Sequence, residues 1–379
     1  MSDDAVAWVR AQRAPMEALL RALVEESSHT LDARGVDAAG AVLRAAVPLR
    51  CRAVPSERFG AHLFFENTRP AKDGGVVLVG HHDTVFPREV FAGYRSEGDV
   101  ARGPGVLDMK GGLVVMAFAL RALEAVDALG RVPLTMAVVA DEEVGSPESG
   151  AWLSEAARGA AVALVFEAGR AGDAIVTQRK GTLALTARAT GRAAHAGNAH
   201  EQGASAIRAM ARFIESAEAL TDYPRGVTIN VGTVHGGTSK NTVPAQCVAE
   251  IDGRFARSAD GVALVAHLHN LVKNSSLAGT VMALTGGIAR APLERTAASA
   301  EWMKRYGECQ VRAGLDAGEA SPQGGGSDAS TTAAAGVPSI DGLGPRGSGF
   351  HTLDERVELD SLVPKCEALV RFLWGMATG

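Results

Sequence analysis

The chain has 379 residues, of which 46% are hydrophobic and 21% are charged, and its formal net charge is −5. This composition is that of a soluble globular protein, and the length suits two domains better than one. The acidic balance excludes a basic surface for nucleic acid, and no apolar run approaches the roughly 18 residues of a membrane span.

The first fifty residues are predicted to be helical, because apolar residues such as Val6, Val9 and Leu20 recur near helical spacing. The chain begins MSDD, and neither the basic nor the apolar segment of a secretory signal follows. We therefore expect a cytoplasmic protein.

Strands and helices alternate along much of the chain. Buried strands are predicted from short apolar runs at residues 76–79, 133–139, 161–166 and 337–340. Helices with an apolar face are predicted at residues 112–128 and 360–377. This alternation predicts an α/β domain, residues 1–180 and 294–379, built on a mixed, mostly parallel sheet flanked by helices.

The pattern changes after about residue 180. Residues 183–189 alternate apolar and polar side chains, as in a sheet with one face in water, and residues 227–231 and 247–251 do the same. A helix is predicted at about residues 201–219. We therefore expect a smaller α+β domain, residues 181–293, inserted into the first.

Histidine and acidic residues follow the predicted buried strands. His81 and Asp83 come after the first strand, Glu142 and Glu143 after the second, and Glu167 after the third. Taken singly, each has an ordinary structural explanation, such as a packed histidine or a solvated acidic loop. The carboxyl ends of parallel strands meet at one edge of a sheet, where open α/β proteins bind ligands. Because zinc takes nitrogen and oxygen ligands, the pattern indicates a metal site there.

Two loops add residues to this edge. One loop, residues 103–112, contains Asp108 and opens a helix, and a second glycine-rich loop ends in His351. The first loop lacks the spacing of a nucleotide-binding phosphate loop, which excludes that function. A carboxylate shared by two zinc ions about 3.5–4 Å apart forms a two-metal hydrolytic site, which these residue types can build.

Three segments resemble signatures of the zinc aminoacylase/carboxypeptidase family, which includes glutamate carboxypeptidase, aminoacylase, acetylornithine deacetylase and succinyl-diaminopimelate desuccinylase. They are HHDTV at residues 81–85, GVLDMKGG at 105–112 and DEEVGS at 141–146. The segments occur in the family's order and spacing, and the resemblance spans nearly the whole chain. It implies a di-zinc amide hydrolase of the zinc-peptidase fold, with an inserted lid domain that forms a homodimer.

The resemblance implies a set of zinc ligands. His81 binds the first zinc, Asp108 bridges both ions, Glu143 and Glu167 each bind one ion, and His351 completes the second site. Two Zn²⁺ ions per chain are expected from these ligand types, although cobalt or manganese can take their place.

The resemblance also implies two acidic residues that act beside the ligands. Asp83 orients the ring of His81, since residues two apart in an extended chain point to the same side. His82 points the other way and is expected to be structural. Glu142 is expected to be the general base, which takes a proton from the bridging water and delivers it to the leaving nitrogen.

Further residues are implied to bind the substrate. The segment GRAAHAG at 191–197 resembles a family segment whose histidine, here His195, steadies the oxyanion in the other subunit's active site. Asn241 resembles an asparagine that binds a substrate oxygen, and Arg290 resembles an arginine that grips the free carboxylate. The backbone of Gly347-Ser348-Gly349 is expected to offer N–H groups to that carboxylate.

The motif around Glu167 and the glycine-rich approach to His351 favour the glutamate carboxypeptidase branch. The expected activity is release of a C-terminal amino acid from an N-acyl or peptidyl substrate. One departure stands against a strict preference for glutamate. In the glutamate carboxypeptidase branch, a lysine that contacts the glutamate side chain of the substrate follows the position of Glu167. This chain has Ile175 there, although Arg179 or Lys180 could take over that contact.

Two alternatives remain open. Aminoacylase, deacetylase or dipeptidase activity fits the same residues, because no single residue separates these activities from a carboxypeptidase. A relative that only binds peptides is a second alternative, which the complete set of expected ligands and the expected base disfavours.

Overall fold

The computed structural model describes residues 2–378, which form two compact units. The smaller unit comprises Gln178–Glu294 together with Gln323–Gly326, and the larger unit comprises the remaining residues. These limits lie close to the expected boundaries at residues 180 and 293. The short segment 323–326 joins the smaller unit because its backbone hydrogen-bonds with residues 178 and 180.

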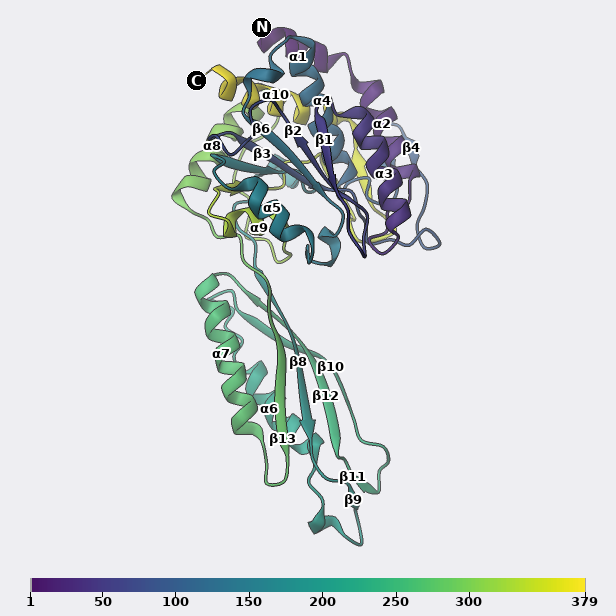
Figure 1. The fold of residues 1–379 in the computed structure, drawn as a ribbon, viewed down its shortest axis with the longest axis vertical. Coiled ribbons are helices and arrows are strands. Elements are labelled where there is room, and N and C mark those ends of the chain that lie inside the picture. The colour runs from purple at the N-terminus through teal and green to yellow at the C-terminus, as the bar shows by residue number, and fades with distance from the viewer. Residues whose placement is uncertain (1, 379) are drawn as a thin grey trace. The chain divides into compact units, whose positions relative to one another are not determined.

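The larger unit contains a six-stranded sheet with the order β1-β2-β6-β3-β7-β14 (Figure 1). Its strands are β1 (Arg50–Val54), β2 (His62–Glu66), β3 (Val76–His81), β6 (Leu134–Val139), β7 (Val162–Val165) and β14 (Ser339–Ile340). Strands β6, β3, β7 and β14 run parallel, while β2 pairs antiparallel with both β6 and β1. This confirms the predicted mixed, mostly parallel sheet.

Every residue of β3, β6 and β7 is buried, which explains why these strands are continuous apolar runs. Helices α5 (Ser149–Ala157) and α9 (Asp328–Ala334) pack on one side of the sheet. The other helices contact one another on the opposite side (Figure 1). They are α1 (Ser2–Arg10), α2 (Arg13–Glu25), α3 (Ala33–Ala46), α4 (Lys110–Ala125), α8 (Ala297–Arg312) and α10 (Leu362–Thr378).

The N-terminal region is helical as expected, but it forms three separate helices, α1 to α3. Asp32 caps α3 by accepting a hydrogen bond from the backbone N–H of Gly35. A second, small sheet has the order β15-β16-β5-β4. Its strands are β4 (Arg95–Glu97), β5 (Val100–Arg102), β15 (Gly347–Ser348) and β16 (Arg356–Glu358).

The smaller unit is a four-stranded antiparallel sheet with the order β10-β12-β8-β13. Its strands are β8 (Gly181–Thr190), β10 (Thr228–Gly236), β12 (Gln246–Phe255) and β13 (Val281–Arg290). Helices α6 (Ala206–Glu218) and α7 (Ser258–Ser275) cover one face, so buried and more exposed residues alternate along β8. A two-stranded pair, β9 (Ala194–His195) with β11 (Thr242–Val243), completes the unit.

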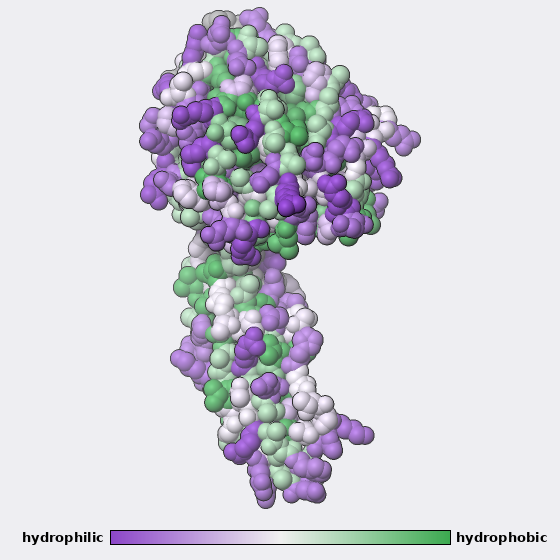
Figure 2. Space-filling model, turned by 45° about the vertical axis from the view of Figure 1, so that its right-hand side comes forward, coloured by the Kyte–Doolittle hydropathy of each residue, from purple (hydrophilic) through white to green (hydrophobic). Residues whose placement is uncertain are grey.

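Each unit has its own hydrophobic core. No helix within residues 2–378 has the length and apolar character needed to cross a membrane. Figure 2 shows a face on which hydrophilic residues are interspersed with apolar ones.

Candidate metal centre

Three neighbouring parallel strands direct acidic and histidine residues to one sheet edge. Strand β3 ends at His81, Glu142 and Glu143 lie in a short 3-10 helix just after β6, and Glu167 follows β7. Because β6, β3 and β7 are adjacent and parallel, these residues emerge side by side. The ends of these three strands therefore lie at one sheet edge, as the order of strands and helices in the sequence predicts.

Asp108 reaches the same edge from the loop that precedes α4. The first turn of α4 packs closely on the end of β7, because a Cβ atom on Gly112 would lie only 2.1 Å from the carbonyl oxygen of Phe166. Only glycine allows this close approach. The contact brings the Asp108 loop beside Glu167.

The side chains form two groups that share Asp108. His81, Asp108 and Glu167 make one group, and Asp108, Glu143 and His351 make the other. Within each group the possible ligand atoms all lie within 4.8 Å of one another. Asp108 Oδ1 is 3.5 Å from Nε2 of His81, and its Oδ2 is 3.4 Å from Nε2 of His351. The two oxygens of one carboxylate thus face two different groups.

The charges and burial of these groups fit bound cations. Three carboxylates share a largely buried site, and burial raises the pKa of Glu143 to about 7. The carboxylates of Asp108 and Glu143, which accept hydrogen bonds from the ring of His351, raise the pKa of His351 to about 10. Asp108 Oδ1 is buried without a hydrogen-bond partner among the described residues. Each group offers one imidazole nitrogen and carboxylate oxygens, a donor set that zinc accepts.

Asp83 supports both sides of this centre. Nδ1 of His81 lies 3.0 Å from the backbone carbonyl of Asp83 and 3.4 Å from its carboxylate, so Nδ1 carries the proton and Nε2 is left as the ligand atom. The same carboxylate accepts hydrogen bonds from the backbone N–H groups of Glu142 and Glu143, at 3.3 and 3.2 Å. Thr30 donates a further bond of 2.8 Å.

Replacing Asp83 by asparagine is expected to weaken zinc binding or turnover by about 10–100-fold. Asparagine keeps the shape but replaces one accepting oxygen with a donor, so the contacts to His81 and to the two backbone amides cannot all persist. Zinc affinity measured by chelator competition checks the expectation. Asp73→Asn, at an exposed position before β3, is the matched control. Wild-type zinc affinity in the Asp83 variant would contradict it.

His82 is fully buried, and burial lowers its pKa to about 3. It belongs to neither ligand group. Neither ring nitrogen has a hydrogen-bond partner among the described residues. A neutral, packed histidine of this kind agrees with the structural role expected for it.

His195 and Asn241 lie together on the β9/β11 pair of the smaller unit, where His195 pairs with Thr242. The backbone N–H of Ala196 donates to the carbonyl of Asn241. Nδ1 of His195 accepts hydrogen bonds from the N–H groups of Gly197 and Asn198, at 3.2 and 3.1 Å. A neutral ring in this arrangement carries its proton on Nε2, which makes Nε2 a hydrogen-bond donor.

Arg290 lies in the four-stranded sheet of the smaller unit, at the end away from the β9/β11 pair. It ends β13 and pairs with Thr182 at the start of β8, whereas Thr190, at the end of β8, leads towards His195. Eight residues of extended chain span roughly 26 Å. Arg290 and His195 of one chain are therefore too far apart to contact one small substrate together.

The remaining residues expected near the substrate are held by strand pairing, backbone conformation or burial. Gly347 and Ser348 form β15, which pairs with β16, and Gly349 has a positive φ of 78°. Ile175 is 1% exposed and belongs to the core of the larger unit. Arg179 is also buried and donates to the carbonyl of Gly325 at 3.2 Å.

Two further residues of the sequence motifs, Lys110 and Asp141, support the loops around the centre. Lys110 is fully buried, and its Nζ donates to the carbonyl of Glu26 at 3.0 Å. Asp141 accepts hydrogen bonds from the N–H groups of Glu148 and Ser149, and thereby closes the turn that carries the two glutamates. Both residues could have been noticed because they belong to the motifs, but the motifs do not indicate which groups they bond to.

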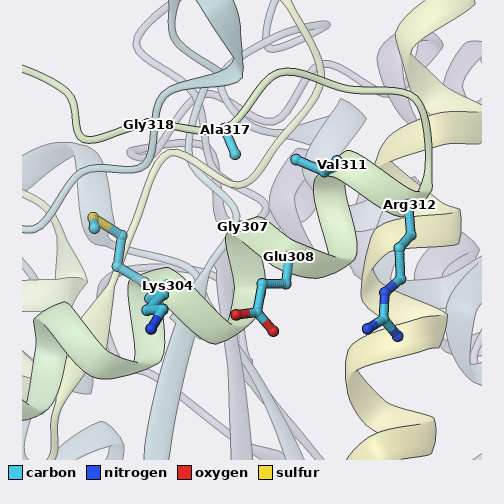
Figure 3. Close-up of a pocket in the computed structure, with 8 residues that line it drawn as sticks. Lys304, Gly307, Glu308, Val311, Arg312, Ala317 and Gly318 are labelled. Atoms are coloured by element: carbon cyan, nitrogen blue, oxygen red, sulfur yellow. The ribbon is translucent and has the colours of Figure 1, made fainter.

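A separate pocket of about 460 Å³ lies between α8 and the loop at Ala317 and Gly318 (Figure 3). Glu308, Val311 and Arg312 line it from the helix. It contains none of the residues of the two ligand groups. The pocket therefore adds nothing to the metal centre.

Known proteins resemble the chain in sequence and in fold. Residues 177–280 match the family model of the M20 peptidase dimerisation domain. Carboxypeptidase G2 from a Pseudomonas species is 28% identical over 370 residues, which cover 95% of this chain and 89% of that protein. A tripeptidase structure from Staphylococcus aureus superposes with a TM-score of 0.81 at 21% identity, covering 97% of this chain and 99% of the other.

A metallo-carboxypeptidase of the M20 family from Sulfolobus solfataricus has the same fold, with a TM-score of 0.77 at 15% identity, and covers 96% of this chain and 99% of its own. The dimerisation-domain match falls largely on the smaller unit. The carboxypeptidase alignment runs through both units. The chain therefore contains an M20 peptidase dimerisation domain, has the fold of M20 metallopeptidases along its full length, and resembles the zinc aminoacylase/carboxypeptidase family in sequence.

Proposed function

We propose that the chain is a di-zinc hydrolase that cleaves an amide bond next to a free carboxylate and releases a C-terminal amino acid from an N-acyl or peptidyl substrate. One observation carries this proposal. The two oxygens of Asp108 face two ligand groups, each with one further histidine and one further carboxylate. The resemblance to carboxypeptidase G2 over most of both chains supports the choice of reaction.

Five side chains would hold the ions: His81 and Glu167 on one side, Glu143 and His351 on the other, and Asp108 between them. When bound, two zinc ions lower the pKa of a shared water towards about 7 and polarise the scissile carbonyl. Cobalt or manganese accepts the same ligand types.

Glu142 is the residue placed to move the proton. Burial raises the pKa of Glu143 and Glu167, and the negative charge of Glu142 raises both further, so its carboxylate lies near both groups, yet it belongs to neither. Its backbone N–H donates to Asp83, which sets the position of the turn. Glu142 takes a proton from the attacking water and delivers it to the leaving nitrogen.

His195 supplies the oxyanion contact, because its Nε2–H group is a donor. Arg290 binds the free carboxylate of the substrate. The backbone of Gly347-Ser348-Gly349 offers N–H groups to that carboxylate, and Asn241, which lies beside His195, binds another substrate oxygen. Arg290 and His195 of one chain are too far apart to contact one small substrate, and the histidine that His195 resembles acts in the other subunit's site, so the complete site requires His195 from a second chain. The protein therefore acts as a homodimer through its smaller unit.

This arrangement predicts complementation between inactive variants. His195→Ala and Glu142→Ala are each expected to be nearly inactive alone. After mixing and subunit exchange, each heterodimer contains one site with both residues intact. Activity is then expected to return to about a quarter of the wild-type value per chain. No recovery despite demonstrated exchange would show that both residues act within the same chain.

The substrate side chain is expected to differ from glutamate. Ile175 is packed in the core and carries no charge, and the guanidinium of Arg179 donates to the carbonyl of Gly325, so of the residues considered only Lys180 is left to read a glutamate side chain. The test is a panel of N-acyl-Glu, N-acyl-Phe, N-acyl-Ala and unblocked dipeptides with zinc-restored protein. Cleavage of N-acyl substrates supports the proposal, and a strong preference for N-acyl-Glu contradicts the side-chain expectation.

The same panel separates the related activities. Cleavage of dipeptides alone would identify a dipeptidase, and cleavage of N-acetyl or N-succinyl groups alone would identify an aminoacylase or deacylase. Zinc bound without any cleavage would favour a protein that only binds peptides.

A further inference from the structure

A carboxylate outside the two ligand groups holds the loop of Asp108. Glu355 is 1% exposed, and its Oε1 accepts hydrogen bonds from the backbone N–H groups of Leu107 and Asp108, both at 2.9 Å. Its Oε2 accepts a third bond, from Gly105 at 3.0 Å. Hydrogen bonds from N–H groups to an ionised carboxylate are stronger than those between neutral groups.

These three N–H groups have no obvious partner within their own loop. Gly103 and Gly105 have positive φ angles of 156° and 71°, so the loop is neither helix nor strand, and its N–H groups converge on one point. A buried N–H group without a partner is unfavourable, and the loop would rearrange to satisfy it. Such a rearrangement displaces Asp108, whose backbone N–H is one of the three.

The backbone of Glu355 is bonded to the loop of His351. The backbone N–H of Glu355 donates to the carbonyl of Thr352 at 3.2 Å, and the N–H of Thr352 donates to the carbonyl of Gly349 at 3.0 Å. These two bonds hold His351 in a tight turn. Immediately after Glu355, strand β16 pairs with β5, the strand that leads into the Asp108 loop. Glu355 therefore connects the two loops whose side chains meet at 3.4 Å between Asp108 Oδ2 and His351 Nε2.

We propose that Glu355 is the positioning residue of the metal centre, whose carboxylate sets the separation of Asp108 and His351 and thereby the geometry of the second metal position. The role rests on the proposed function only in assuming that these groups hold metal ions. Glu355 does not touch the ions or the substrate. It acts through the backbone of one ligand loop and the chain connection to the other.

The test compares Glu355→Gln with Asp354→Asn in the full-length protein. Glutamine keeps the size, but one of its oxygens becomes an NH₂ group that faces backbone donors, so at least one of the three bonds is lost. Asp354 is the neighbouring carboxylate, with a side chain that is 85% exposed, and serves as the matched control. Zinc affinity is measured by chelator competition, and the visible absorption spectrum is recorded after cobalt substitution.

Glu355→Gln is expected to bind the second metal about 10–100-fold more weakly, in the range found when groups that support metal ligands are removed. The cobalt spectrum is expected to change, and kcat is expected to fall with little change in KM. Asp354→Asn is expected to match the wild type in all of these. Glu355→Asp, which keeps the charge on a shorter side chain, is expected to recover part of the affinity.

A lower melting temperature with wild-type zinc affinity and an unchanged cobalt spectrum would overturn the proposal, since Glu355 would then be only structural. Should Glu355→Gln not fold, the same spectrum and affinity in Glu355→Asp decide: wild-type values overturn the proposal, and weakened second-site binding supports it. Because the readout is metal binding, it remains valid if the wild type binds metal but cleaves none of the tested substrates. That result would overturn the proposed function alone.

Discussion

Glu142→Ala is expected to lower kcat by about 10²–10⁴-fold, the usual contribution of a general acid–base group, while the zinc content stays at the wild-type level. The reason is that Glu142 lies beside the two ligand groups without belonging to either. Turnover of the best N-acyl substrate and elemental analysis of the same sample measure the two quantities together.

The matched control is Glu155→Ala, at an exposed position on α5. It is expected to retain wild-type turnover and zinc. Loss of zinc from Glu142→Ala would instead make Glu142 a metal ligand. Wild-type turnover by Glu142→Ala would show that Glu142 is not the general base and that another group takes the proton.

Asp108→Ala is expected to remove both metal ions and all measurable turnover, whereas His351→Ala is expected to remove only one ion. The difference follows from geometry, because Asp108 is the one residue shared by the two groups and His351 belongs to the second alone. Metal stoichiometry after equilibration with zinc and gel filtration distinguishes the two variants.

Bound metal is also expected to change the thermal stability of the protein. Without ions, the remaining carboxylates Glu143 and Glu167 stay buried, and burial raises the pKa of both. Binding of metal to the native state raises its stability by mass action, so the wild type is expected to melt at a higher temperature with zinc than with a chelator. Asp108→Ala is expected to lose this zinc-dependent increase. Two ions bound to Asp108→Ala would contradict the bridging arrangement.

The convergence of His81, Glu143 and Glu167 could be predicted because it depends on local order. Each residue follows an apolar strand, and the strand-to-helix alternation predicts a parallel sheet whose strand ends share one edge. The short antiparallel strands β1 and β2 gave no comparable signal, because β2 takes its register from β6 and β1 takes its register from β2, and neither has a clear pattern of its own.

Other features depend on contacts between distant parts of the chain. The hydrogen bonds that Gly105, Leu107 and Asp108 donate to Glu355 join residues about 250 positions apart, and no sequence motif indicates them. The proton position on His195 depends on two backbone donors in its own turn, which composition alone does not specify.

Composition and strand patterning were thus sufficient for the fold class, because it follows from periodicity along the chain. The inserted domain was predicted from the same patterning, and the full set of candidate ligands from the resemblance of three short motifs to a known family. The tertiary structure decided how Asp83 and Glu355 hold the loops, and that His195 and Arg290 of one chain lie far apart. These properties arise from packing and hydrogen bonding between segments far apart in sequence. Local patterns carry no information about such distances.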